Sequence, residues 1–212
     1  MDTKNFDYYY ENYLRELSYF QIMNEQMLEN TAYSMIESSV SVINEDEYHS
    51  KLLGTPICEF YKALESWKEK WKNIESAPIT IEGSVNILPI EDVLNWNAWD
   101  FEPDLFPQME NFTVLDWIDD SHVVGLYLGQ PERGLFYMNM DSNPQPINLD
   151  FNGYLEMTKY TKAVFLWQLG CIEPIVDKSS HRYLEKLTQL DPTITVEGFY
   201  ELFDRLRIDK YL

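Results

Sequence analysis

Three short runs of β-branched and aromatic residues form the clearest hydrophobic pattern in the middle of the chain. They cover Phe112–Trp117, Val123–Leu128 and Leu135–Met140. Turn-forming residues separate them: two aspartates and a serine after the first run, and a stretch with glycine and proline after the second. Short turns between such runs favour pairing of neighbours in an antiparallel sheet. We therefore predict three consecutive strands, with Pro146–Leu149 as a shorter edge strand, because proline suits a strand edge.

A helix with little polar surface is predicted after these strands. Asn152 is a suitable N-cap, and Glu156 lies near the helix start, where the helix dipole favours a carboxylate. The second half, Ala163–Trp167, is apolar on every side. A helix without a polar face is normally buried, so we expect residues 153–169 to pack against the three strands.

Helical spacing of apolar residues dominates the N-terminal part of the chain. It runs strongly from Phe6 to Met23 and more weakly to Ile36, which predicts one long or two broken helices. A second helix is predicted from Thr55, its cap, with Pro56 in the first helical position. One face of this helix carries the apolar stripe Ile57, Phe60, Tyr61, Leu64, Trp67 and Trp71, and its polar side carries Lys62, Lys68, Lys70 and Lys72.

The other segments predict shorter elements. Ile79–Ile87 indicates two short strands or one bulged strand around a glycine, and Leu88–Leu94 indicates a turn into a short helix. An aromatic-rich loop, Asn95–Asn111, should lie against the sheet because its large apolar side chains need burial. Amphipathic helices are predicted at His181–Leu190 and from Thr195.

Together these elements define the fold class. We expect an α+β fold, with a mostly antiparallel sheet and helices packed on one side and at both ends. A helical N-terminal arm, residues 1–75, precedes an α+β core with C-terminal helices, residues 76–212. No linker is long or polar enough to force a cut, so the two parts should form one continuous structural unit.

The strongly acidic composition indicates that a macromolecular partner, if there is one, is a basic protein. The chain has 212 residues and a formal net charge of -20. Such a charge disfavours nucleic acid and anionic membrane surfaces as direct partners; the alternative is that it serves solubility alone. No apolar stretch approaches the ~18 residues that span a bilayer, and no signal peptide is visible. Cys58 and Cys171 are isolated, so we expect neither a zinc site nor a disulfide framework and predict a reduced, cytoplasmic setting.

Motifs for catalysis are absent from the sequence. It has no Gly-rich phosphate loop, no G-x-S-x-G turn and no H-E-x-x-H pair. His49, His122 and His181 are scattered beside turns, where exposed or capping roles are commoner than those of ligand or base. Two carboxylates could still meet as an acid–base pair on folding, but the sequence selects none. We therefore predict no enzymatic activity, no metal and no cofactor.

The distribution of charge yields the sharpest functional hypothesis. Twelve acidic residues and no Lys or Arg lie between Lys72 and Arg133. This block reflects either a generally acidic composition or a surface that steers a basic partner. The candidate partner-binding residues are the carboxylates Asp116, Asp119, Asp120 and Glu132, the first three in a turn expected to be exposed, and the tryptophans Trp96, Trp99 and Trp117. The aspartates lack the ligand spacing and the glycine of an EF-hand loop.

Several segments between Ile79 and Leu169 follow one another in a recognisable order. They are Val85-Asn-Ile-Leu-Pro-Ile-Glu-Asp-Val-Leu94, a strand with Trp117-Ile118, Gly125-Leu-Tyr-Leu-Gly129, Leu135-Phe-Tyr-Met-Asn-Met140 and Asp150-Phe-Asn-Gly-Tyr-Leu155. This order resembles the SUKH superfamily, in which a leucine and acidic-valine segment precedes a glycine-containing hairpin and a turn into a helix. The chain differs from that pattern in its glycine-poor hairpin and its long N-terminal arm.

The resemblance implies a binding function. The superfamily includes fungal regulators of cell-wall assembly and killer-toxin resistance, and many bacterial immunity proteins. It implies an α+β fold and an immunity protein that occludes a toxin, or a regulatory scaffold. An acidic inhibitor can compete for the surface with which a basic nuclease toxin grips nucleic acid. The alternative is an enzyme or small-ligand-binding protein that uses an aromatic cleft near Trp96, Trp99 and Trp117.

Overall fold

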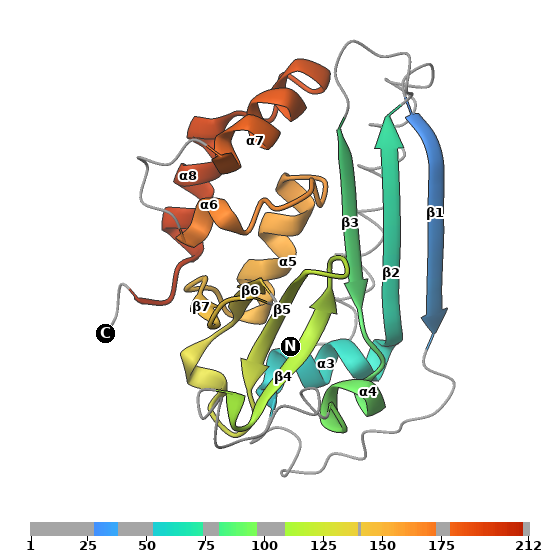
Figure 1. Cartoon of the computed structure of the whole chain (residues 1–212), viewed down its shortest axis with the longest axis vertical. Coiled ribbons are helices and arrows are strands. Elements are labelled where there is room, and N and C mark those ends of the chain that lie inside the picture. The colour runs from blue at the N-terminus through green and yellow to red at the C-terminus, as the bar shows by residue number, and fades with distance from the viewer. Residues whose placement is uncertain are drawn as a thin grey trace.

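An antiparallel sheet, whose strands follow chain order from β1 to β7, is the framework of the structure, a computed structural model (Figure 1). The structure describes residues 28–37, 53–73, 81–96, 109–139, 141–172 and 179–209. Within them the strands are β1 (Leu28–Glu37), β2 (Leu64–Asn73), β3 (Glu82–Ile87), β4 (Phe112–Trp117), β5 (His122–Tyr127), β6 (Phe136–Asn139) and β7 (Gln145–Pro146). Helices lie on one side of this sheet and at its ends, so the predicted α+β class is confirmed.

The three predicted central strands are confirmed as β4, β5 and β6. They pair consecutively and antiparallel, with Trp117 opposite Val123 and Gly125 opposite Phe136. β7 overlaps the predicted edge strand Pro146–Leu149 only at Pro146, where it pairs with β6. Backbone bonds from Ile147 to Leu135 and from Leu135 to Leu149 continue the contact along the rest of the predicted segment. β3 is one strand that begins at Glu82 and continues through Gly83 in unbroken register with β2, without the predicted bulge at Gly83. Residues 79 and 80 lie outside the described residues.

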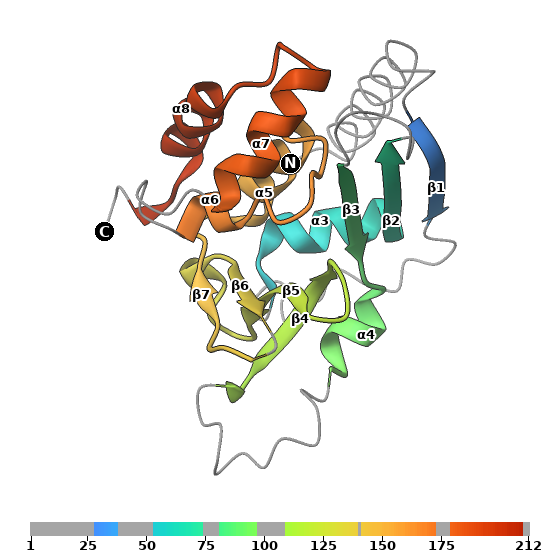
Figure 2. The same ribbon diagram turned by 45° about the horizontal axis from the view of Figure 1, so that its top comes forward.

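The sheet divides between β3 and β4. In the described residues these strands share one register pair, Ile87 with Asp116, and the amide of Leu88 donates to the carbonyl of Leu115 at 2.9 Å. Figures 1 and 2 show the consequence: β1–β3 form one group of strands, and β4–β7 form a second group turned away from it. Because β3 and β4 share so little pairing, other contacts must link the two groups of strands.

The helix predicted from Thr55 to Trp71 is wrong over its second half. Helix α3 (Thr55–Ala63) is followed directly by β2. Trp67 and Trp71 cannot distinguish the two structures, because residues four apart share a face in a helix and in a strand. The distinguishing signal is period-2 alternation: the tryptophans are buried, while the lysines between and beyond them are exposed or half-buried on the opposite face, namely Lys68, Lys70 and Lys72.

The weaker helical pattern toward Ile36 is also wrong. Residues 28–37 form β1, which pairs with β2 along most of its length. β2 in turn pairs with β3 from Trp67 to Lys72, so the sheet contains strands from both predicted parts of the chain. The helices predicted before residue 28 lie outside the described residues, as does most of the aromatic-rich loop.

The long buried helix predicted over residues 153–169 is much shorter. Helix α5 (Phe151–Tyr160) is capped by Asp150, two residues before the predicted cap Asn152, through a 2.7 Å bond from the amide of Gly153. The next residues form turns in which Lys162, Ala163 and Leu166 have positive φ, before the short helix α6 (Leu169–Ile172). The predicted burial is nevertheless correct for Ala163, Val164 and Trp167.

Bonding to β3 explains why this segment is not helical. The amide of Ser84 donates to the carbonyl of Ala163, and the amide of Phe165 donates to the carbonyl of Glu82, both at 2.9 Å. The indole of Trp71 adds a 2.7 Å bond to the carbonyl of Lys162. The segment thus completes the edge of β3 that β4 leaves unpaired, and a helix would use the same backbone groups internally.

The remaining predicted helices are confirmed. They are α4 (Ile90–Leu94), α7 (Ser179–Leu190) and α8 (Val196–Leu206), and Thr195 caps α8 through a 2.9 Å bond from Gly198. The main core lies between these helices and the sheet. A smaller group of buried residues lies on the opposite face of β4–β6, and we call it the outer cluster: Met109, Phe112, Val114, Val123, Tyr127, Phe136 and Met138.

Replacing Gly83 by alanine is expected to destabilise the fold through the link between β3 and the turn segment. A Cβ here would collide with the Trp71 indole and lie 2.7 Å from the carbonyl oxygen of Ala163. Such overpacking costs about 1–3 kcal/mol, and displacement of Trp71 would also break its bond to Lys162. Urea denaturation measures the change. The control is Gly129→Ala, where φ is +78° and no atom lies within 4 Å; it carries only backbone strain, about 1 kcal/mol. Equal losses in the two variants would contradict the packing argument.

Candidate functional site

The residues predicted to bind a partner do not form one surface. Asp116 is in the core, Asp119 and Asp120 are in the β4–β5 turn, and Glu132 belongs to the 3-10 helix η2 (Pro131–Arg133). The turn and η2 lie at opposite ends of β5, roughly 20 Å apart at the usual rise of a strand. The tryptophans are elsewhere: Trp96 and Trp117 border the outer cluster, and Trp99 lies outside the described residues.

The expectation that Asp116 is exposed in a turn is wrong. It is 0% exposed and lies within β4. The register of β4 against β5 shifts between Val114 and Asp116, so that Asp116 pairs with Val124, the position that Leu115 would take in an unbroken ladder. Such a bulge turns two successive side chains to the same face. The carboxyl group therefore points toward the helices with Leu115, and strict alternation cannot reveal this from sequence.

The Asp116 carboxylate links three elements of the fold. Its Oδ1 accepts a 2.8 Å bond from the backbone amide of Asn86 in β3. Its Oδ2 accepts a 2.5 Å bond from the hydroxyl of Tyr154 in α5. The side-chain amide of Gln168 donates to the same hydroxyl at 3.1 Å. This arrangement joins β3, β4 and α5 at the point where the sheet divides.

Burial controls the ionisation of this carboxyl group. It raises the pKa of Asp116 to about 6, and the bonds from Tyr154 and Asn86 only partly oppose the rise. Burial and the nearby Asp116 charge also raise the pKa of the phenols of Tyr154 and Tyr61, the latter donating to the carbonyl of Leu88 at 2.6 Å. The group can exchange a proton near pH 6. Because Asp116 has no exposed surface, its observed contacts are with the fold and not with a substrate.

A second polar group lies at the β4–β5 turn and joins Asp119, a predicted partner-binding residue, to His122, for which the sequence favours an exposed or capping role. Asp119 accepts bonds from the amides of Ser121 and His122 at 2.7 and 2.8 Å, and its carboxylate lies 2.9 Å from Nδ1 of His122. Nε2 of the same ring is 3.3 Å from the side-chain nitrogen of Asn139. One ring nitrogen thus faces the aspartate of the turn, and the other faces the end of β6. The signal in the sequence is the aspartate at the start of the turn, because an aspartate side chain commonly bonds the backbone amide two residues on in an Asx turn, here that of Ser121.

The predicted aromatic site is only partly visible. The rings of Trp96 and Trp117 lie 5.4 Å apart, and both are half-buried at the border of the outer cluster. The guanidinium of Arg133 covers another part of the outer cluster, 4.3 Å from the ring centre of Tyr127 and 5.0 Å from that of Phe136. These contacts are those of side chains packed on a sheet face.

Exposed carboxylates collect at the end of the hairpin where β4 begins. Glu110 lies two residues before β4, Glu132 lies in η2 after β5, and two more carboxylates lie on the short helix α4. The hydroxyl of Thr113, near the start of β4, donates to the carbonyl of Val93 and so holds α4 beside this strand. We call this group the acidic end: Glu91, Asp92, Glu110 and Glu132, all of them exposed. Asp120 is exposed at the opposite end of the hairpin. Among the described residues, no three His, Cys, Asp or Glu side chains cluster in a way that could hold a metal ion.

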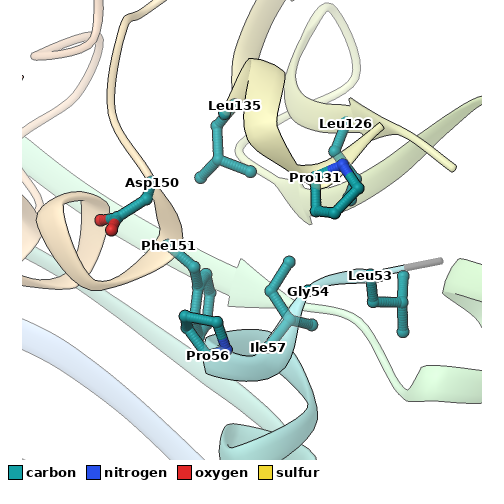
Figure 3. Close-up of a pocket in the computed structure, with 10 residues that line it drawn as sticks. Leu53, Gly54, Pro56, Ile57, Leu126, Pro131, Leu135, Asp150 and Phe151 are labelled. Atoms are coloured by element: carbon teal, nitrogen blue, oxygen red, sulfur yellow. The ribbon is translucent and has the colours of Figure 1, made fainter. Parts of the chain in front are cut away.

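A small hollow adjoins the acidic end (Figure 3). Its volume is about 50 Å³, and it lies between the start of α3, η2 and the start of α5. In Figure 3 the side chains of Ile57 and Leu135 point into it, and the carboxylate of Asp150 lies at one side with its oxygens directed away from the middle. None of the predicted partner-binding residues lines it, although Pro131, which does, precedes Glu132.

Comparison of the chain with profiles of known protein families, with curated proteins and with solved structures gives no match. Within the described part of the chain, every helix is too short or too polar to cross a membrane. The geometry of the site therefore carries the functional argument.

The stability of the protein is expected to depend on pH through Asp116. The pKa of its carboxyl group is raised in the folded state from 3.8 to about 6, so the folded state holds the proton more tightly. Its stabilising contribution is complete below pH ~3.8 and is lost as the pH rises through ~6, a change on the order of 3 kcal/mol. The difference in unfolding free energy between the parent protein and Asp116→Asn should shrink by that amount from pH 4 to pH 7. Asp120→Asn, at an exposed site, is the control; a pH-independent difference for Asp116→Asn would contradict the prediction.

Replacement of Tyr154 by phenylalanine should destabilise the protein more at pH 7 than at pH 4.5. It removes the hydroxyl that donates to the Asp116 carboxylate, and a bond to a charged group contributes about 1.5–3 kcal/mol. At pH 4.5 Asp116 is largely protonated, so the loss is smaller. Tyr160→Phe is the matched control, because that hydroxyl bonds only the backbone of Thr195 among its observed partners. Chemical denaturation at both pH values tests this, and equal pH dependence of the two variants would contradict it.

Proposed function

We propose that this chain is a non-enzymatic protein-binding module of the SUKH type, an immunity protein that binds and occludes a basic toxin domain. The observation that carries the proposal is the exposure of carboxylates at both ends of the β4–β5 hairpin, in a stretch from Asn73 to Glu132 without any Lys or Arg. A surface with one sign of charge attracts a partner of the opposite sign and raises its rate of association.

Burial and turn bonding leave fewer carboxylates as candidates for the proposed contact. Asp116 is buried, and Asp119 is engaged by the backbone of its own turn. The proposed contact groups are therefore Asp120 at one end of the hairpin and the acidic end at the other. The nearest downstream cation, Arg133, lies over Tyr127 and Phe136 on the outer cluster.

The two most chemically suggestive groups also support binding over catalysis. Asp116 bonds to β3 and α5, and His122 contacts Asp119 and Asn139 through its two ring nitrogens. The bonds of Asp116 and the contacts of His122 stabilise the fold, and this structural role explains why each residue lies where it does. The alternative of a ligand cleft between Trp96 and Trp117 has weaker support, because their rings pack against each other.

Charge reversal at the exposed carboxylates is expected to slow association with the toxin. The variant Asp120→Lys/Glu132→Lys is compared with Glu185→Lys/Glu201→Lys, which changes the net charge equally at exposed positions on α7 and α8. The binding partner is the purified protein encoded beside this chain's gene, and association is followed by stopped flow at two salt concentrations. The first variant should slow association about tenfold with a smaller change in dissociation, and added salt should slow the parent protein, because charges are screened beyond ~8 Å at physiological ionic strength.

The same measurements can reject the proposal. Equal effects of the two double variants on the association rate would show that Asp120 and Glu132 have no special role. Association that is independent of salt would remove the electrostatic mechanism. Lack of binding to the neighbouring gene product, with protection of cells also absent, would reject the immunity function itself.

A further inference from the structure

The hollow beside η2 has the dimensions and chemistry of a site for one side chain of a partner. We propose that it accepts a branched aliphatic side chain, that of Leu, Ile or Val, carried by a basic segment of the partner protein. This inference rests on the proposed function and adds an apolar anchor to the charged interface. The acidic end would then determine how fast the partner arrives, and the hollow would determine how long it stays.

The volume of the hollow limits what can enter. It is about 50 Å³, one third of the ~150 Å³ cavity that binds benzene in a protein core. An aromatic ring is therefore too large, whereas the tip of a branched aliphatic side chain fits. The walls are aliphatic where Ile57, Leu126 and Leu135 meet, all 3% exposed or less. An apolar group entering here would lose contact with water on most of its surface.

The walls of the hollow are held in place by residues with fixed backbone conformations. Pro56 is the second residue of α3 and Pro131 is the first residue of η2, and proline fixes φ near -65°. Gly54 and Gly134 line the hollow with φ of 84° and 70°. A Cβ on Gly54 would lie 3.0 Å from Cβ of Pro131, so the two elements are in close contact. A site formed in advance loses little conformational entropy when it binds.

Charge at the margin favours a basic segment around the apolar group. Asp150 lines the hollow, and Glu132 follows the lining residue Pro131 and is exposed. No Lys or Arg is among the lining residues. The nearby Arg133 lies over Tyr127 and Phe136, which face the outer cluster, whereas Leu126 and Leu135 belong to the main core. The cation is thus directed to the opposite face of the sheet. The Asp150 carboxylate caps α5 and turns away from the hollow, so the exposed carboxylate of Glu132 is the negative charge at the margin.

Three short peptides test the site without the toxin. They are acetyl-Lys-Leu-Lys-amide, acetyl-Lys-Ala-Lys-amide and acetyl-Glu-Leu-Glu-amide, titrated into the isotope-labelled full chain while NMR shifts are recorded. The Lys-Leu-Lys peptide should shift the signals of Ile57, Leu126 and Leu135 and bind about tenfold more tightly than either of the others, a difference typical of a side chain that fills a pocket. Equal binding of the leucine and alanine peptides, shifts centred elsewhere, or no binding by any peptide would overturn the proposal.

A variant that covers the hollow provides the second arm. Pro56→Phe places a ring at its half-exposed margin and should abolish the shifts caused by Lys-Leu-Lys. Pro192→Phe, at an exposed turn between α7 and α8, is the matched control and should bind as the parent does. If Pro56→Phe does not fold, the comparison of the leucine and alanine peptides on the parent chain still decides the proposal. Binding by Pro56→Phe equal to that of the control would overturn it.

The outcomes separate this inference from the proposed function. Toxin binding with no leucine preference among the peptides would reject the anchor site and leave the immunity function in place. A leucine preference without toxin binding would reject that function and retain the hollow as a side-chain site. With both present, Pro56→Phe should speed dissociation of the toxin about tenfold and leave its association nearly unchanged.

Discussion

The hydrogen bonds of the Asp116 carboxylate fix the relative positions of the two groups of strands and of helix α5. Where β3 leaves β4, the amide of Asn86 has no carbonyl of β4 opposite it, and Oδ1 of Asp116 takes that place. An unsatisfied buried donor would cost about 1–3 kcal/mol. The other oxygen accepts from Tyr154, so the same group fixes α5 against the division. The bulge in β4 is what brings the carboxylate to this side of the sheet.

A second link closes the other part of the β3 edge and depends on the first for its position. The turn segment after α5 bonds to β3 through Ala163 and Phe165, and Trp71 holds the carbonyl of Lys162. Positive φ at non-glycine residues is strained, and such strain persists only where surrounding contacts over-determine the backbone. Here the hydrogen bonds to β3 hold the backbone of the turn segment. The lack of a side chain at Gly83 leaves room for this close approach. Both links replace ordinary strand pairing by a few specific hydrogen bonds.

The sequence predicts those parts of the fold that depend on local pattern. β4, β5, β6, α7 and α8 are bounded by turns or caps, so neighbouring residues determine their type. The errors arise where distant residues decide. Trp67 and Trp71 fit a helix and a strand equally well, and pairing with β1 and β3 selects the strand. Of the candidate site, the exposure of Asp120 and Glu132 could be predicted, but the burial of Asp116 could not, because a bulge leaves no trace in residue type.

The carboxylates of this chain therefore have two physically distinct roles that a count of acidic residues cannot separate. Asp116 acts over bond distances in a buried setting, where mobile ions do not enter and screening is weak. Asp120 and the acidic end act through water over distances comparable with the Debye length. Salt is therefore expected to weaken the long-range attraction of the proposed basic partner while leaving the bonds of the interior carboxylate nearly intact. Substitutions at the surface carboxylates would change the proposed recognition without altering the contact that holds β3, β4 and α5 together.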